Sequence, residues 1–421
     1  MAAKRKKLQG GELTRIMAWP GGRVHEVAGF RTACMYCGIK SKVGNSDIAL
    51  LACDTLAAAA AVYTTNLVCA APVFLSRMAL HKSKGRVRAV VINSGNANAC
   101  TGVQGERDAA AMARLTAKGL GCKAEQIQVC STGIIGHHLP MQKVGVGIAE
   151  LTRRVRTDGE PGDFARAILT TDTVPKTAAC TIELDGVLVR IAGATKGAGM
   201  IAPRMATTLG FIVTDAVAEP KVLQTALSSV AAETYNCMTI DGDTSTNDTL
   251  ILMASGKAGN KPVKQVQGPA YAALRAGLYW VCDSLARQIA ADGEGATHTI
   301  TLFVGGARSH HDAVTAARAI AESPLVKTAI AGCDPNWGRI MAAAGRSGAT
   351  FDPAAASLTV QGVELFRAGT PTKFDAAEAE NKLKERDVSI VLMLGDGPGS
   401  AKFYTCDLTK GYVEINAAYH T

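Results

Sequence analysis

The stretch Lys196-Gly-Ala-Gly-Met-Ile-Ala-Pro-Arg-Met-Ala-Thr-Thr-Leu-Gly-Phe211 passes from a loop into an apolar segment. Gly197 and Pro203 predict a loop, because glycine and proline both interrupt regular structure. The apolar residues from Leu209 onward predict a buried strand. Thr207 is therefore expected where this loop enters the strand, next to a second threonine, Thr208.

A threonine at such a junction can be a nucleophile. Its hydroxyl is weak until a base lies beside it, and a threonine at a free chain end supplies that base through its own α-amine. Such an end arises when the threonine attacks the preceding carbonyl group and the resulting ester is hydrolysed. Thr207 and Thr208 are both candidates, and threonine is also an ordinary strand former, so the residues alone leave these interpretations open.

Strand and helix patterns alternate on both sides of this stretch. Expected strands cover residues 87–93, 127–131, 182–185, 187–191, 209–213, 297–304, 387–394 and 401–407, and expected helices cover 106–118, 221–237 and 270–291. Asp185-Gly186 is a strong two-residue hairpin turn. The mixture predicts a layered α/β or α+β architecture, without fixing the strand order.

The composition is that of a folded globular chain of 421 residues, of which 48% are hydrophobic and 19% charged. Residues 1–206 hold 27 Lys+Arg and 14 Asp+Glu, whereas residues 207–421 hold 18 and 22. The basic charges are scattered and no nucleic-acid motif accompanies them, so we expect no nucleic-acid partner. The best apolar run, Leu56–Val62, is short and mostly alanine, well below the ~18–20 apolar residues of a membrane span, so we expect no membrane partner.

Twelve cysteines without an N-terminal export signal indicate free thiols in a reducing compartment, and we expect a cytoplasmic protein. Cys34 and Cys37 form a lone C-x-x-C, and a structural zinc site needs further ligands at set spacing. The pairs His137-His138 and His310-His311 are typical of surface imidazoles, because neighbouring side chains diverge. The segment 241–252 has alternating oxygen ligands but lacks the glycine and the final glutamate of a calcium loop. We expect no metal.

Cys130-Ser-Thr-Gly-Ile-Ile-Gly136 follows an expected strand. The Thr132 hydroxyl and the Gly133 amide are donors of the kind that stabilise an oxyanion in acyl transfer. A plain glycine turn is the alternative. Ser131 or Cys130 could also be a nucleophile, but no G-x-S-x-G pattern surrounds them.

Two further segments combine glycine or threonine with charge. One is Thr170-Thr-Asp-Thr-Val-Pro-Lys176. The other is Asp292-Gly-Glu-Gly-Ala-Thr297, in which a carboxylate lies between two glycines that let a ligand amine approach closely. A solvated turn is the alternative for this second segment.

Together and in this order, these segments resemble one family, the ornithine acetyltransferases, which are the glutamate N-acetyltransferases of arginine biosynthesis. The resemblance runs from about Gly29 to Thr421. The matching stretches are 93–99, 131–133, 171–176, 196–201, 205–207, 241–248, 292–297, 334–339 and 416–421.

This resemblance implies a layered αββα fold with a smaller α/β lid, similar in style to the N-terminal-nucleophile hydrolases. It implies self-cleavage between Ala206 and Thr207. The two products, residues 1–206 and residues 207–421, would form one catalytic unit with Thr207 as its nucleophile. Two copies of each would assemble.

The resemblance also assigns the site. Thr132 and Gly133 match the oxyanion hole, and the substrate-contacting positions match Thr173, Lys196, Thr207, Glu294, Asn416 and Thr421. The implied reaction moves the acetyl group of N2-acetylornithine to glutamate by a ping-pong route without a cofactor. Acetyl-CoA is a further donor in bifunctional members, and no motif decides whether it is one here.

Five positions depart from the residues usual in the family: Arg204, Thr208, His298, Ala418 and His420. Thr208 leaves two threonines side by side, although the register after Ala206 favours Thr207. The alternative function is that of a self-cleaving threonine aminopeptidase or amidohydrolase, which would pass its acyl group to water.

Overall fold

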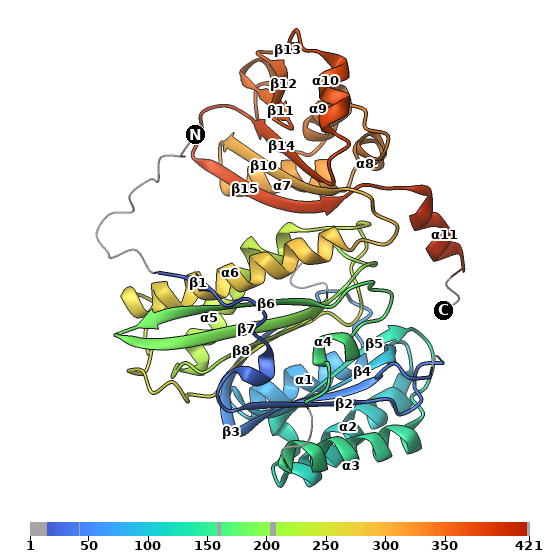
Figure 1. The fold of residues 1–421 in the computed structure, drawn as a ribbon, viewed down its shortest axis with the longest axis vertical. Helices are drawn as coiled ribbons and strands as arrows, with labels where there is room; N and C mark the ends of the chain where they lie inside the picture. The colour runs from blue at the N-terminus through green and yellow to red at the C-terminus, as the bar shows by residue number, and fades with distance from the viewer. Residues whose placement is uncertain (1–14, 42, 158–160, 203–207, 419–421) are drawn as a thin grey trace.

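The computed structural model describes residues 15–41, 43–157, 161–202 and 208–418 (Figure 1). One large unit is built from most of the chain before residue 255 together with the next helix, Pro269–Ala291. Residues 299–406 build a smaller unit beside it. No helix within the described ranges is long and apolar enough to cross a bilayer.

The large unit is built on a nine-stranded sheet with the order β1-β6-β7-β8-β9-β3-β4-β5, in which β2 also pairs with β3. Its strands are β1 (Met17–Ala18), β2 (Phe30–Met35), β3 (Ile48–Tyr63), β4 (Arg86–Asn96), β5 (Ile127–Ile134), β6 (Lys176–Leu184), β7 (Val187–Lys196), β8 (Leu209–Thr214) and β9 (Thr249–Ala254). The predicted turn Asp185-Gly186 joins β6 to β7 with both residues at positive φ, which confirms the hairpin.

Strand β3 belongs to both halves of this sheet. Its first half pairs with β2 and β4, its second half pairs with β9, and the register with β4 shifts between Ala52 and Ala57. Side chains of β3 therefore reach three apolar clusters. Leu51 packs between the two halves, Leu50 packs toward one outer helix layer, and Ala60 packs toward the other. The sheet thus forms two facing layers.

Helices cover the outer face of each layer (Figure 1). On one side lie α1 (Ala71–Lys82), α2 (Gly102–Leu120) and α3 (Met141–Arg156), and on the other lie α5 (Pro220–Glu233) and α6 (Pro269–Ala291). The short α4 (Phe164–Ala167) packs between the layers, where Phe164 meets Phe211 edge to face. The expected αββα arrangement is confirmed. Short 3-10 turns span Val24–Glu26, Ala124–Gln126, Tyr235–Cys237 and Pro353–Ala355.

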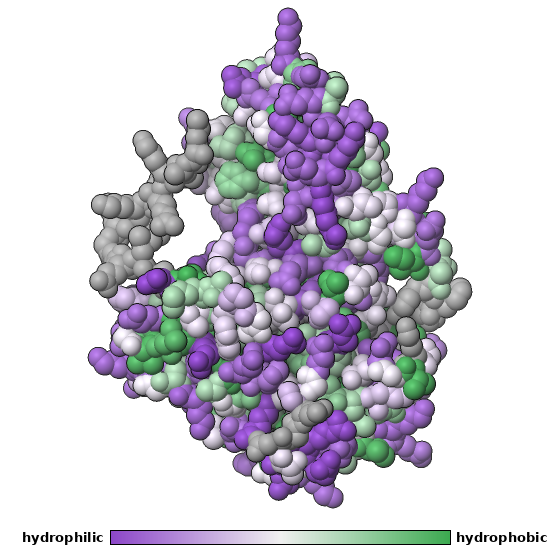
Figure 2. Space-filling view, in the orientation of Figure 1, coloured by the Kyte–Doolittle hydropathy of each residue, from purple (hydrophilic) through white to green (hydrophobic). Residues whose placement is uncertain are grey.

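The smaller unit has its own six-stranded sheet with the order β13-β12-β11-β14-β10-β15. Its strands are β10 (Thr299–Ala307), β11 (Ser357–Val360), β12 (Val363–Arg367), β13 (Thr370–Pro371), β14 (Asp387–Met393) and β15 (Gly399–Cys406). Its helices are α7 (His310–Ala321), α8 (Pro324–Ala331), α9 (Trp337–Gly345) and α10 (Ala376–Lys382). This confirms the expected smaller α/β unit. It lies beside α6, and its visible face is largely hydrophilic (Figure 2).

The last described helix, α11 (Lys410–Ala418), leaves the smaller unit and runs down beside the sandwich (Figure 1).

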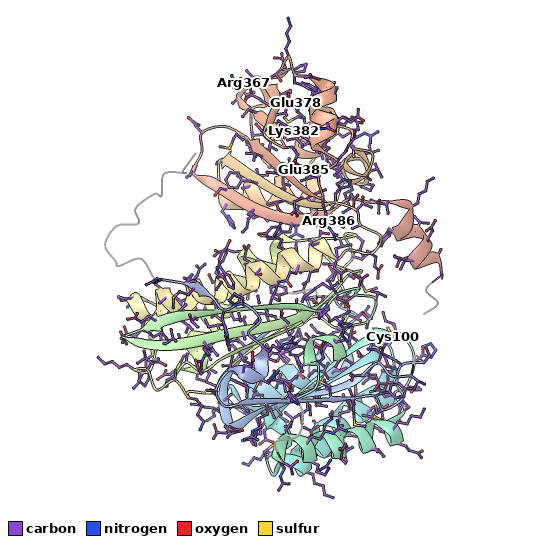
Figure 3. All side chains as sticks on the ribbon, in the orientation of Figure 1. Cys100, Arg367, Glu378, Lys382, Glu385 and Arg386 are labelled. Carbon is purple, nitrogen blue, oxygen red and sulfur yellow. The ribbon has the colours of Figure 1, made fainter. Side chains whose placement is uncertain are left out.

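The labelled charged residues Glu378 and Lys382 belong to the smaller unit and lie far from the sandwich (Figure 3). They pair with each other on α10, with Nζ 2.8 Å from Oε1. Cys100 is exposed and lies near the ends of β4 and β5 (Figure 3). All twelve cysteines are free thiols.

Candidate active site

The ends of β4 and β5 form one wall of the candidate site. The two strands are parallel, and Gly95 pairs with Gly133 where β4 becomes irregular. Gly133 has a φ of +131°, and a Cβ at this position would overlap the backbone of Gly95. Only glycine fits there. Gly133 and the neighbouring Thr132, which the resemblance assigns to the oxyanion hole, both line a cavity.

A buried asparagine fixes this wall. Asn247 Nδ2 donates to the carbonyl of Ala97 at 2.6 Å and to the carbonyl of Ser131 at 2.9 Å. The Ser131 hydroxyl donates to Asn93 Oδ1 at 2.5 Å inside the core. Burial raises the pKa of the Cys130 thiol far above its ordinary value. Neither Ser131 nor Cys130 is therefore placed or activated as a nucleophile.

Lys196 ends β7 beside these donors. Its Nζ donates to Thr170 Oγ1 at 2.6 Å and to Thr132 Oγ1 at 3.3 Å, and it lies 3.9 Å from Asp172 Oδ2. Burial lowers the pKa of Lys196, and the Asp172 charge opposes this effect. Because Thr132 Oγ1 accepts from Lys196, its own proton is free to point at a ligand.

A network of buried ion pairs lies next to Lys196. Lys176 is fully buried, and its Nζ lies 2.6 Å from both Asp172 Oδ1 and Asp292 Oδ2. Asp172 also accepts from the Gly197 amide at 2.6 Å. Burial acts to raise the pKa of Asp172, but the charges of Lys196 and Lys176 outweigh it and hold the pKa at about 2. The carboxylate is therefore ionised and ties three segments together.

Glu294 and Asn416 form the opposite wall. Asn416 Nδ2 donates to Glu294 Oε2 at 2.9 Å, which links α11 to the turn after α6. Gly199 and Gly295 allow these approaches. A Cβ at Gly199 would overlap the Glu294 carboxylate, and one at Gly295, whose φ is +68°, would overlap the backbone of α11.

These walls enclose a cavity of about 260 Å³. Its described lining residues are Ala97, Thr132, Gly133, Ile135, Thr170, Thr171, Lys196, Gly199, Met200, Ser245, Thr246, Asn247, Glu294 and Asn416. The lining carries a lysine contributed by β7 and a carboxylate contributed by the turn after α6. Such a cavity suits a small ligand that bears both a negative and a positive group.

Thr173 lies apart from the other predicted residues. It is not among the described lining residues, and its hydroxyl donates to Asp292 while its amide donates to the same carboxylate at 3.0 Å. Ala206, Thr207 and Thr421 lie outside the described residues. The structure therefore brings together Thr132, Gly133, Lys196, Glu294 and Asn416.

Thr208 is described and is buried at the start of β8. Its Oγ1 lies 3.3 Å from Thr195 Oγ1, and its backbone carbonyl accepts from the Thr249 amide at 2.8 Å. A hydroxyl enclosed in this way does not face the cavity. This placement argues against Thr208 as the nucleophile.

The segment 241–252 serves the loop instead of a cation. Asp241 accepts from the amides of Met200 at 2.6 Å, Ile201 at 2.8 Å and Asp243 at 3.2 Å. It thereby anchors the loop that leads toward residue 203. Within the described ranges, no three His, Cys, Asp or Glu side chains gather as a metal site.

The residues that hold the site in place were not predicted from the sequence. Thr170, Asp172 and Lys176 lie in a segment that the sequence singled out, but their partners could not be identified. Lys176 and Asp172 are four residues apart, which was the one available signal. Asp292 is 116 residues from Lys176, so no local pattern indicates that they meet.

The layered αββα fold holds a cavity with hydroxyl and amide donors, a buried lysine and a carboxylate, which are groups that acyl-transfer enzymes use. The ArgJ family matches residues 31–421. The arginine biosynthesis bifunctional protein ArgJ of Symbiobacterium thermophilum is 47% identical over 407 residues, which are 96% of this chain and 100% of that protein. The ArgJ protein of Chlorobaculum tepidum is 45% identical over 396 residues, which are 93% of this chain and 96% of that protein.

A solved structure is also similar. It is the ornithine acetyltransferase of Mycobacterium tuberculosis in complex with ornithine, 38% identical, with a TM-score of 0.40. The match covers 46% of this chain and 100% of that one. The present chain belongs to the ArgJ family and is an acyltransferase of arginine biosynthesis.

Proposed function

We propose that this enzyme transfers the acetyl group of N2-acetylornithine to glutamate through an acetyl ester on Thr207. The observation that carries the proposal is the cavity between Lys196 and Glu294, with Thr132 and Gly133 on its wall. Acetyl donor and acceptor share an α-carboxylate, so one cation can bind both in turn. Family membership supports the same reaction.

Lys196 and Glu294 would each bind a different charged group of the substrate. The Lys196 ammonium group would pair with the substrate α-carboxylate by a charge-assisted hydrogen bond. The Glu294 carboxylate, held by Asn416, would engage the substrate amine. Thr173, whose amide donates a hydrogen bond to Asp292, would contact the substrate at the edge of the site. Thr421 would complete the substrate contacts.

In the first half-reaction, the α-amine of Thr207 takes the proton of its own hydroxyl, directly or through water. The hydroxyl oxygen attacks the acetyl carbonyl, and Thr132 and Gly133 stabilise the oxyanion. The bond between the carbonyl carbon and the ornithine nitrogen then breaks. The proton passes to that nitrogen, and ornithine leaves.

In the second half-reaction, the amine of glutamate attacks the acetyl ester. The same oxyanion donors act again, and Thr207 recovers its hydroxyl proton. The product is N-acetylglutamate. This ping-pong route needs no cofactor, because the side chain itself carries the acetyl group. Acetyl-CoA would be a second donor if the enzyme also makes N-acetylglutamate directly.

The proposal requires a free α-amine on Thr207, and so a cut after Ala206. Residues 1–206 and residues 207–421 would then form one catalytic unit, and two such units would assemble. We place the enzyme in the cytoplasm, with small molecules as its partners and without nucleic acid or membrane.

The test is an assay with N2-acetylornithine labelled in its acetyl group, run with and without glutamate. Labelled N-acetylglutamate that forms only when glutamate is present supports transfer. Release of labelled acetate at the same rate without glutamate would show a hydrolase and would contradict the proposal.

A further inference from the structure

Asn247 joins the two strands that carry the candidate oxyanion donors. It is buried shortly before β9, and its Nδ2 donates to the carbonyls of Ala97 at 2.6 Å and Ser131 at 2.9 Å. Ala97 directly follows β4, and Ser131 lies in β5 directly before Thr132. One side chain therefore holds the end of β4 and the last residues of β5 in a fixed relation.

The Asn247 amide has a partner for each of its polar atoms. Both neighbours of Nδ2 are carbonyl oxygens, which only accept, so the NH2 group has to face them. Oδ1 accepts from the Thr246 hydroxyl at 2.6 Å. Asn247 lines the cavity, but both of its N–H groups are already donated. An oxyanion needs donors, so Asn247 can act on it only through the residues that it holds.

The two bonds from Nδ2 act on either side of Thr132 and Gly133. The Ser131 carbonyl and the Thr132 amide belong to one planar peptide unit, so a bond to that carbonyl fixes the plane before the donors. Ala97, the other partner, donates its amide to the Ile134 carbonyl at 2.9 Å and so holds β5 after the donors. Gly133 has a φ of +131°, and glycine has little conformational preference of its own. The direction of the donors therefore depends on these two fixed points.

We propose that Asn247 is a positioning residue for the oxyanion donors Thr132 and Gly133. The inference rests on the proposed function, in which these donors stabilise the tetrahedral oxyanion. A donor contributes when it already lies where the negative charge develops, and a displacement of about 1 Å can cost roughly 100-fold in rate. Asn247 follows residue 207 in the chain, whereas both donors precede it. The part of the chain after the proposed cut thus sets the geometry of donors that lie before it.

The test measures the rate of acetyl transfer and, separately, the binding of a ligand without an acetyl group. Asn247→Ala removes both hydrogen bonds and adds no charge. We expect kcat for transfer from N2-acetylornithine to glutamate to fall roughly 100-fold. Ornithine has no acetyl carbonyl, so its Kd, measured by calorimetry, should stay within about three-fold of wild type. A kcat within about three-fold of wild type, or an ornithine Kd that rises as much as kcat falls, would overturn the inference.

The matched control is Asn66→Ala. The Asn66 Nδ2 donates to the Thr244 carbonyl at 2.8 Å, so it holds the segment that leads to Asn247 through the same kind of bond. Its kcat and its Kd for ornithine should match wild type. A loss of kcat in Asn66→Ala equal to that in Asn247→Ala would show a general effect of this segment and would overturn the role of Asn247.

A second measurement leaves Asn247 unchanged, in case Asn247→Ala fails to fold. It is a crystal structure of the wild-type enzyme with a phosphonate analogue of N2-acetylornithine, in which tetrahedral phosphorus replaces the acetyl carbonyl carbon. We expect a phosphonate oxygen at Thr132 and Gly133, with Nδ2 of Asn247 still bonded to both carbonyls. An Asn247 amide turned toward the analogue, or parted from the carbonyls, would overturn the inference.

Failure of the proposed function gives a different result. Release of acetate to water by the wild-type enzyme, in place of transfer to glutamate, would contradict that function. The rate of acetate release in Asn247→Ala, compared with wild type, would then still decide the role of Asn247, because hydrolysis passes through the same oxyanion. The two failures are therefore distinguishable.

Discussion

Lys196 is buried at the cavity and donates hydrogen bonds to two threonines, and in the proposed function its charge binds the substrate carboxylate. Replacing it with methionine keeps the volume and removes the charge. A hydrogen bond to a charged group contributes about 1.5–3 kcal/mol, so Lys196→Met should raise the KM for both N2-acetylornithine and glutamate by roughly 10- to 100-fold. Steady-state kinetics measure this.

The control for this prediction is Lys143→Met. Lys143 lies outside the cavity, with its Nζ 3.4 Å from the Gly38 carbonyl. It should leave both KM values unchanged. If Lys196→Met also leaves them unchanged, Lys196 does not bind the carboxylate.

Lys176 shows a different role for a buried cation, since it lies between Asp172 and Asp292 and is not among the described residues that line the cavity. Removing one partner of a buried ion pair leaves the others uncompensated and typically costs about 3–5 kcal/mol. Lys176→Met should lower the free energy of unfolding by that amount in the uncut Thr207→Ala background. Urea unfolding measures it.

The matched comparison is Arg153→Met, which removes a surface ion pair with Glu150. Exposed pairs contribute at most about 1 kcal/mol. Equal losses in the two variants would show that the Lys176 network does not stabilise the fold. The contact between Lys176 and Asp292 joins residues 116 apart in the chain, and for that reason the sequence alone did not predict it.

The sequence predicted eight of the strands and the three helices α2, α5 and α6, but not α1, α3 or α7. The hairpin of β6 and β7 and the helices α2, α5 and α6 all follow from local patterns. Strand β3 was missed, because the run 56–62 is mostly alanine, a weak strand former. Its small side chains are needed where one strand packs against three clusters, which is a tertiary requirement. Asp241, which the sequence suggested only as a failed calcium ligand, accepts hydrogen bonds from the amides of Met200 and Ile201.

A further prediction concerns the position of helix α11. It is held against the turn after α6 because Gly295 has no side chain. Gly295→Ala should displace α11, separate Asn416 from Glu294, and raise KM by about ten-fold, which corresponds to one charged hydrogen bond. Substrate kinetics on a variant that still melts cooperatively measure this.

Gly268→Ala is the control for that change. Gly268 also has a positive φ, but a Cβ there would meet nothing within 4 Å. Its substrate kinetics should match wild type. If Gly295→Ala also has wild-type kinetics, the close packing of α11 against residue 295 does not contribute to substrate binding.

The sheet order interleaves strands from the two halves of the chain. Strands β8 and β9 follow residue 207, yet they lie between β7 and β3, which precede it. β8 pairs with β7 along its full length, and β9 pairs with β3. Strand order is not encoded in local patterns, so the sequence left it open.

This topology predicts that a cut after residue 206 releases neither product. The two fragments should co-elute in gel filtration under native conditions and separate only in denaturant. Dissociation under native conditions would contradict the interleaved sheet, because strands from both fragments would have to unpair. The uncut Thr207→Ala chain provides the elution standard for the intact molecule.

In the proposed reaction, the Thr207 hydroxyl carries the acetyl group between the two substrates. The most direct measurement is a denaturing intact-mass spectrum taken shortly after mixing the enzyme with N2-acetylornithine and no glutamate. We expect two fragments, of which the one beginning at Thr207 gains one acetyl group and loses it when glutamate is added. A single uncut chain, or a fragment that gains no acetyl group while transfer proceeds, would contradict it.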